Sequence, residues 1–213
     1  MMCAAGSHRD VRVAYGVSMK HSTKALTVAL ALLCMAAPAV AGKTVTKKYS
    51  LQTSAGQPAG SVTFSQKNDG PVKVKVVLEN VPFGPHGVHI HANPVCDAPD
   101  FKGAGGHFNP FDKQHGFENP LGHHAGDMPQ NIMVGEDHRG EATFMLKDIT
   151  LQPGHPNSVP GNGLSFVVHA HGDDMKTNPS GNSGNRIACG VLLPGPKPPA
   201  PPAAPVAPAA PLQ

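Results

Sequence analysis

The sequence predicts an all-β domain, an eight-stranded antiparallel Greek-key β-barrel or sandwich with long loops folded over one face. Three observations support this fold class. The 213 residues include 24 glycines and 23 prolines but no tryptophan, a composition typical of turn-rich β proteins. About eight short segments alternate between apolar and polar residues or are rich in β-branched residues. No long segment has the 3.6-residue periodicity of an amphipathic helix.

Residues 1–41 are predicted to be a leader that contains a secretory signal. Lys20 and Lys24 supply the positive start, residues 25–37 form an apolar run, and Ala39-Val40-Ala41 fits an A-x-A cleavage site. The run is shorter than the ~20 residues that span a bilayer, so we expect cleavage after Ala41 and no membrane anchor in the mature protein. We take Met19 as the true start.

Removal of the leader changes the charge and the cysteine count. The leader holds four of the 17 basic and one of the 14 acidic residues, which leaves 13 of each. The net charge of +3 therefore belongs to the leader and does not indicate a nucleic-acid or membrane partner. Two cysteines remain, Cys96 and Cys189, and in an exported chain they predict one disulfide rather than two free thiols.

The strands are expected in a regular order along residues 42–193, which form the single domain. The eight segments are 45–52, 61–66, 72–79, 86–92, 131–136, 141–147, 164–170 and 187–193. Two long connections interrupt them, one after residue 92 and one over residues 172–186. Residues 194–213 are a Pro/Ala-rich tail that cannot bury a core and is predicted to be extended or disordered.

The first long connection concentrates metal-ligand residues. His107, His115, His124 and Asp127 follow one another at spacings of eight, nine and three residues, between Gly, Pro and Asn residues that indicate a loop. Three imidazoles and one carboxylate make a closed tetrahedral shell that suits Zn²⁺. The alternative is a His-rich surface loop without a ligand. A bound metal would also explain how so long a loop is ordered.

The strand before this loop supplies a second set of imidazoles. His89 and His91 alternate with Val88 and Ile90, so they share one face of the strand. His169 lies in another apolar strand segment, and imidazoles without a carboxylate suit copper. His107 is the best candidate for a fourth ligand, because it is the loop histidine nearest in sequence. An imidazole has two ring nitrogens, so His107 could bridge both metals.

These motifs together resemble the copper/zinc superoxide dismutases of the bacterial secreted type, over roughly residues 45–193. The resemblance rests on GVHIH, GGHFNP, the His107 to Asp127 spacing, VVHA with an aspartate four residues after its histidine, and NRIACGV. It implies one copper and one zinc per subunit. Copper would be bound by His89, His91, His107 and His169, and zinc by His107, His115, His124 and Asp127.

The function implied by the resemblance is dismutation of superoxide to O₂ and H₂O₂ through alternating reduction and reoxidation of copper, with His107 as bridge and proton donor. It implies antioxidant defence in the periplasm by a homodimer or a monomer. Asp173 would orient histidines of both metal shells, and Arg186 would bind the anionic substrate beside copper. Lys176 is the only lysine of residues 172–186, so long-range attraction of the anion is expected to be weaker than in many relatives.

The remaining histidines are predicted not to be ligands. His171 shares a face with His169 but has no family match as a ligand, and the spacing to Asp127 favours His124 over His123. His86, His138 and His155 are expected at solvated strand or turn edges. Two other functions stay open, a metal carrier on the same fold and a zinc-only hydrolase. The hydrolase would need an open zinc position, whereas four zinc ligands are already present.

Overall fold

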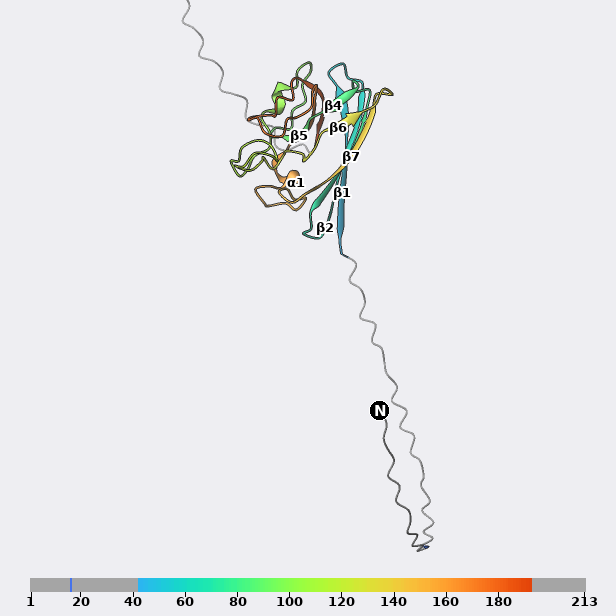
Figure 1. The fold of residues 1–213 in the computed structure, drawn as a ribbon, viewed down its shortest axis with the longest axis vertical. Helices are drawn as coiled ribbons and strands as arrows, with labels where there is room; N and C mark the ends of the chain where they lie inside the picture. Colours follow the sequence, from blue (N-terminus) through green and yellow to red (C-terminus); the bar gives the residue numbers. More distant parts are fainter. Residues whose placement is uncertain (1–15, 17–41, 193–213) are drawn as a thin grey trace, which may run out of the picture. The chain divides into compact units, whose positions relative to one another are not determined.

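The computed structural model describes residues 16 and 42–192, and its strands form one large and one small antiparallel sheet (Figure 1). The large sheet has seven strands in the order β5-β8-β9-β1-β2-β3-β7, and β4 pairs with β6 in the small one. The strands are β1 (Thr44–Thr53), β2 (Pro58–Lys67), β3 (Val72–Glu79), β4 (Gly84–His86), β5 (Val88–His91), β6 (Ile132–Val134), β7 (Arg139–Leu146), β8 (Ser165–His169) and β9 (Arg186–Val191). The helices are a 3-10 turn, η1 (Lys102–Ala104), and a short α1 (Val159–Asn162).

The strand order confirms the predicted antiparallel fold with Greek-key crossovers. The last strand, β9, pairs with the first, β1, and β3 pairs with β7 instead of the next strand in sequence. Only Gly87 separates β4 from β5, so the small sheet continues from the edge of the large one. Each of the eight predicted segments overlaps an observed strand, and β4 is a ninth, short strand.

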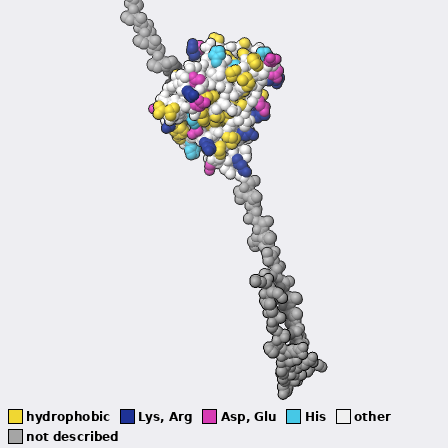
Figure 2. Space-filling view, viewed as in Figure 1, with side chains coloured by type: hydrophobic (Ala, Val, Ile, Leu, Met, Phe, Trp, Pro, Cys, Tyr) yellow, Lys and Arg dark blue, Asp and Glu magenta, His cyan; other side chains and the backbone are white. Residues whose placement is uncertain are grey.

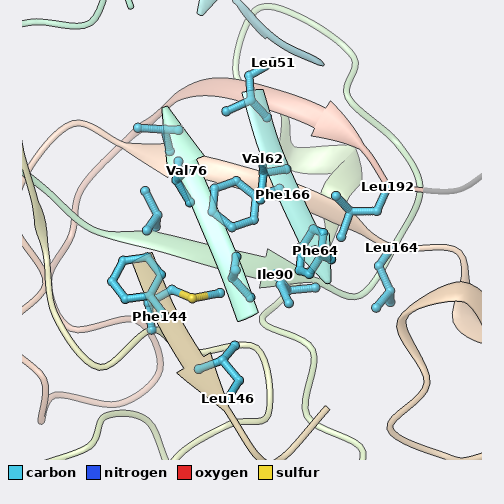
Figure 3. Packing of buried hydrophobic residues seen from close by; sticks show 14 of the residues in the cluster. Leu51, Val62, Phe64, Val76, Ile90, Phe144, Leu146, Leu164, Phe166 and Leu192 are labelled. Carbon is cyan, nitrogen blue, oxygen red and sulfur yellow. The ribbon is translucent and has the colours of Figure 1, made fainter. Parts of the chain in front are cut away.

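One hydrophobic core fills the space enclosed by the sheets. Strand β3 shows why it forms, because Val72, Val74, Val76 and Leu78 are fully buried while Lys73 and Lys75 between them are exposed. This is the alternation of a strand with one face in the core. Residues from both halves of the sheet meet there. Figure 3 shows Leu51, Val62, Phe64, Val76, Ile90, Phe144 and Phe166 among them.

Two strands are buried on both faces, and these strands carry three of the four predicted copper ligands. All four residues of β5 and all five of β8 are buried. Val88, Ile90, Phe166 and Val168 face the core. The opposite face is covered by the loop between β5 and β6, which we call the metal loop (residues 92–131).

A disulfide ties the metal loop to the sheet. Cys96 and Cys189 are bonded, with their Cα atoms 5.6 Å apart, which confirms the predicted pairing. Cys189 lies on β9 in a small apolar cluster with Phe101, Ala104 and Val167. The start of the metal loop is therefore fixed to the outer face of β8 and β9.

The surface of the domain carries charges of both signs. Basic and acidic side chains lie near one another on the face shown in Figure 2. Three lysines pair with carboxylates, namely Lys75 with Glu141, Lys102 with Asp100 and Lys176 with Glu118. Neither helix within residues 42–192 has the length and apolar character needed to cross a bilayer. The predicted leader and the Pro/Ala-rich tail lie outside the described residues.

Candidate metal centre

The metal loop lies along the edge of β5. Ile90 N donates to Gly126 O (2.9 Å), and Phe108 N donates to Ile90 O (2.8 Å), so two loop segments pair with the strand. The contact is close enough to require glycine at position 126, where a Cβ would lie 2.3 Å from Ile90 O. This pairing sets His107 opposite His91 and Asp127 opposite His89. Loop ligands and strand ligands are thereby brought together by backbone hydrogen bonds.

The four histidines predicted to bind copper come together and form the first set of possible ligands. One ring nitrogen from each of His89, His91, His107 and His169 lies within 4.8 Å of the others. His91 Nδ1 donates to Gly105 O (2.9 Å), and His169 Nδ1 donates to Gly184 O (3.2 Å). A neutral imidazole has one N–H and one lone pair, so these bonds leave Nε2 of each ring as an acceptor. The two Nε2 atoms face each other at 3.4 Å.

The second ligand set contains a carboxylate. Ligand atoms of His89, His107, His115 and Asp127 lie within 4.8 Å of one another. Asp127 Oδ1 accepts from His107 Nδ1 (2.8 Å), and Asp127 Oδ2 lies 3.1 Å from His115 Nδ1. His124, the fourth predicted zinc ligand, is outside this set of four but borders it. Its Nδ1 is 3.4 Å from His107 Nδ1 and 3.3 Å from Asp127 Oδ1.

Asp127 contacts both the backbone of the metal loop and the neighbouring imidazoles. Oδ2 accepts from the backbone N–H groups of Gly116 and His124, both at 3.0 Å. Oδ1 faces the Nδ1 atoms of His107 and His124. One carboxylate therefore closes a turn of the loop and presents an oxygen to the imidazoles, which explains the short spacing between His124 and Asp127.

The donor atoms of both sets fit metal ions. His89 Nδ1, His107 Nε2 and His115 Nδ1 are buried and have no hydrogen-bond partner among the described residues. A buried polar atom without a partner is costly, and a metal bond would satisfy each of them. Four imidazoles suit copper, and three imidazoles with a carboxylate suit zinc. His107 is the residue whose two nitrogens face both sets.

The electrostatics of the first ligand set and of Asp127 favour the protonation states that ligands need. Burial, together with the neighbouring His107, lowers the pKa of His89 and His91 well below the ordinary value. Burial also lowers the pKa of His169 to about 4. Burial opposes ionisation of Asp127, but hydrogen bonds from His107 and the other imidazoles hold the pKa of this carboxyl well below its usual range. Neutral imidazoles and an ionised carboxylate are the metal-binding forms.

Asp173 is hydrogen-bonded to one histidine of each ligand set. Its Oδ2 accepts from His89 Nε2 (2.7 Å), and its Oδ1 accepts from His115 Nε2 (3.0 Å). These bonds direct Nδ1 of both rings toward the centre. Burial lowers the pKa of His115, but contacts with Asp127 and Asp173 outweigh this and raise the pKa to about 9. The two carboxylates thus create a site that favours a positive charge.

Arg186 lies at the open side of the first ligand set. A cavity of about 380 Å³ is lined by Arg186 together with His91, His107 and His169. Arg186 Nη1 donates to Phe101 O (2.7 Å), and Nη2 donates to Gly105 O (2.6 Å). Both acceptors belong to the segment tied down by the disulfide. Among the described residues that line this cavity, Arg186 is the only Lys or Arg.

Four of the other histidines behave as expected and one, His86, does not. His171 is exposed and belongs to neither ligand set, and His123 stacks on Phe117 with ring centroids 3.7 Å apart. The prediction that His86 is solvated is wrong, because its side chain is 1% exposed. His86 Nδ1 lies 2.7 Å from His169 O, and Nε2 lies 2.8 Å from Pro82 O. A neighbouring glycine and a short strand gave no sign of this burial. His138 and His155 are exposed, as predicted.

Some groups that shape the site escaped prediction because they carry no motif. The carbonyl oxygens of Gly105 and Gly184 fix the orientation of His91 and His169, and no side chain marks them. Asn178 Oδ1 accepts from His115 N (3.0 Å) across 63 residues. Such contacts depend on how the loops fold against one another. In the sequence, the abundance of Gly, Asn and Pro indicates only that loops are present.

Comparisons with known proteins agree with this geometry. The family profile described as copper/zinc superoxide dismutase (SODC) matches residues 58–192. The chain is 41% identical over 140 residues to "Superoxide dismutase-like protein YojM" of Bacillus subtilis (strain 168), covering 65% of this chain and 71% of that protein. It is 43% identical over 139 residues to "Superoxide dismutase (Cu-Zn) 1" of Aquifex aeolicus (strain VF5), covering 64% and 81%.

Solved structures are similar as well. The crystal structure of a double mutant of a superoxide dismutase-like protein from Bacillus subtilis matches with a TM-score of 0.65 and 40% identity, covering 68% of this chain and 96% of that chain. The Cu/Zn superoxide dismutase from Brucella abortus matches with a TM-score of 0.55 and 25% identity, covering 70% and 99%.

Proposed function

The chain belongs to the copper/zinc superoxide dismutase family, and from this premise we propose that it dismutates superoxide to O₂ and H₂O₂. The observation that carries the proposal is the position of His107. Its Nδ1 faces the carboxylate of Asp127, and its Nε2 is buried without a partner beside the other three histidines. His89 and His107 belong to both ligand sets, but His89 Nε2 is bonded to Asp173, so His107 is the imidazole with one nitrogen toward each set, as a bridged two-metal site requires.

Each metal would be held by a distinct set of donors. His89, His91, His107 and His169 would hold copper, and His107, His115, His124 and Asp127 would hold zinc. Copper would supply the one-electron chemistry, accepting an electron from one superoxide and returning it to a second, while zinc has no redox chemistry of its own. The two-site arrangement needs no protein nucleophile.

His107 is the chain's proton carrier in this proposal. Its Nδ1 is occupied on the side of Asp127, which leaves Nε2 as the atom that can take up or release a proton. Nε2 lies next to the cavity that His107 helps to line. Burial lowers the pKa of His107, so a proton held there is readily given to a reduced, basic product.

Arg186 binds and orients the anion. Its two carbonyl contacts hold the guanidinium in place at the cavity wall, where its charge attracts superoxide. Lys102 and Lys176 are paired with Asp100 and Glu118 at 2.7 Å, which weakens their contribution at a distance. We therefore expect most of the attraction to come from Arg186.

The site of action proposed for the protein is outside the cytoplasm, in the periplasm. The Cys96–Cys189 disulfide supports an oxidising compartment, and residues 19–41 have the sequence features of a secretory signal. In this setting the role would be antioxidant defence, by a monomer or a homodimer.

The test is a dismutation assay on protein loaded with copper and zinc, beside a His107→Ala variant and a His171→Ala control. Wild type and His171→Ala should both be active, since His171 is an exposed histidine outside the ligand sets. His107→Ala should lose activity. Stoichiometric binding of both metals without any dismutation by the wild type would refute the proposal and favour a metal carrier.

A further inference from the structure

The backbone of Asp173 is held by a single side chain from outside its own loop. Asn131 Nδ2 donates to Asp173 O (2.9 Å), and Asp173 N donates to Asn131 Oδ1 (2.7 Å). The two residues are 42 positions apart in the sequence. Asn131 thus offers Asp173 one donor and one acceptor, as a neighbouring strand would, and satisfies both backbone groups of this residue.

The backbone of Asp173 needs these hydrogen bonds from Asn131 more than the backbone of a strand residue would. It lies in the connection between β8 and β9, where residues 171–185 contain no helix or strand. Its carboxylate must meet His89 and His115 at once, with 2.7 and 3.0 Å between the paired atoms. Hydrogen bonds weaken steeply as their geometry degrades, so a small shift of the Asp173 backbone would weaken both.

Asn131 links the loop that carries Asp173 to the small sheet. It directly precedes β6, whose Ile132 and Val134 are fully buried in the core. The side chain of Asn131 is therefore fixed by a packed strand and not by the mobile end of another loop. Asp173 is also confined by β4 and β5, because a Cβ added at Gly87, between these strands, would lie 3.1 Å from the Cβ of Asp173.

We propose that Asn131 is a positioning residue for both metal shells, acting through the backbone of Asp173. The inference rests on the proposed use of His89 and His115 as copper and zinc ligands. Asn131 touches neither ligand. It sets where the Asp173 carboxylate lies, and that carboxylate sets which nitrogen of each ring is free for a metal. One asparagine at the end of the metal loop would then affect both sites together.

The experiment compares Asn131→Ala with Asn119→Ala, a matched control. Asn119 also connects the metal loop to the segment after β8, through Nδ2 to Lys176 O (3.2 Å), but does not contact Asp173. Both variants lose an asparagine that ties the same two loops. Only Asn131→Ala should release Asp173. Asn131→Ser, which can keep one of the two bonds, provides a milder variant if the alanine protein folds poorly.

The first measurement is made on metal-free protein by nitrogen-15 NMR of the imidazole Nε2–H groups of His89 and His115. Their exchange with solvent should be about tenfold faster in Asn131→Ala, from the loss of hydrogen bonding to Asp173. It should stay near the wild-type rate in Asn119→Ala. The second measurement is the affinity for copper and for zinc by chelator competition. Both affinities should fall together by about tenfold, the low end for a residue that supports a ligand.

A purely structural role for Asn131 gives a different result. The proposal is overturned if Asn131→Ala melts at a lower temperature but keeps wild-type imidazole exchange and wild-type affinity for both metals. It is also overturned if one metal alone is affected, or if Asn119→Ala gives the same changes. The NMR and affinity data do not depend on turnover, so a failure of the dismutase proposal would be recognised separately, in the activity assay.

Discussion

Removal of the Cys96–Cys189 disulfide should destabilise the domain by an amount that the loop length predicts. The bond joins residues 93 positions apart. In the chain-entropy description, a closed loop of this size restricts the unfolded chain by about 4.7 kcal/mol at 25 °C, whereas native disulfides typically contribute ~2–4 kcal/mol. We therefore expect Cys96→Ala/Cys189→Ala to lower the free energy of unfolding by ~2–5 kcal/mol.

The assay is equilibrium urea unfolding of metal-free protein, so that metal affinity does not enter the measured free energy. The double alanine variant avoids a free thiol and places no hydroxyl in the apolar cluster of Phe101 and Val167. Wild-type protein reduced with a thiol reagent is the matched control and should lose a similar free energy. Equal unfolding midpoints for the oxidised, reduced and mutant proteins would refute the reasoning. Two alkylatable cysteines in the exported wild type would refute it as well.

The same variant has a second expected effect, on the substrate cavity. Phe101 and Gly105, whose carbonyl oxygens hold Arg186, lie in the segment that starts at Cys96. Without the disulfide this segment is less constrained, so the guanidinium should be held less firmly. The dismutation rate of the metal-loaded variant should therefore fall even at temperatures where it is fully folded. An unchanged rate would mean that Arg186 is positioned without help from the disulfide.

Three further predictions concern the site. His107→Ala should lower the retention of both copper and zinc, whereas His115→Ala should mainly lower the retention of zinc. Mass spectrometry of the purified variants measures both metals. Full activity of His107→Ala would contradict the proposed bridging role of His107. Arg186→Ala should keep both metals but lower the second-order rate of dismutation roughly tenfold or more, and Arg186→Lys should have an intermediate rate. Pulse radiolysis over a salt series measures these rates. Equal rates for wild type and Arg186→Ala at low salt would contradict the role of Arg186 in guiding the anion. In metal-free protein, burial lowers the pKa of His169 to about 4, so stability should decrease as the pH falls from ~6.5 to 4, because the unfolded chain binds the proton first. Burial lowers the pKa of His115, but the contacts with Asp127 and Asp173 outweigh burial and raise this pKa to about 9. The stability that protonated His115 contributes should therefore be lost as the pH rises from ~6.5 through 9. Urea unfolding across pH tests both slopes, and a stability that does not change with pH would contradict them.

The fold could be predicted because its strands carry local signals. In β3 the alternation of valines and lysines specifies both the strand and its buried face. The strand β4 was not separated from β5, because its three residues, Gly84–His86, are too few to show a period. The burial of His86 was missed for a related reason. Its two contacts are carbonyl oxygens of Pro82 and His169, and a backbone oxygen has no signature in a sequence.

The candidate ligand residues could be picked out from the sequence, and most of the residues that contact them could not. His107, His115, His124 and Asp127 stood out because a loop rarely concentrates such groups, and the structure brings them together. Asn131 did not stand out, because one asparagine before a strand is unremarkable. Its role arises from a pairing across 42 residues that only the folded chain reveals.

The position of His107 follows from the way the two ligand sets are built. Three predicted copper ligands, His89, His91 and His169, lie on β5 and β8, so the barrel fixes them. The predicted zinc ligands lie on the metal loop, whose geometry depends on turns and on Asp127. A bridging residue must be positioned relative to both the strands and the metal loop. The loop segment next to His107 is hydrogen-bonded to β5, since Phe108 N donates to Ile90 O and Ala92 N donates to Gly106 O. His107 therefore lies between two residues that are hydrogen-bonded to the β5 segment, and this position suits it to the proposed bridge between the two metals.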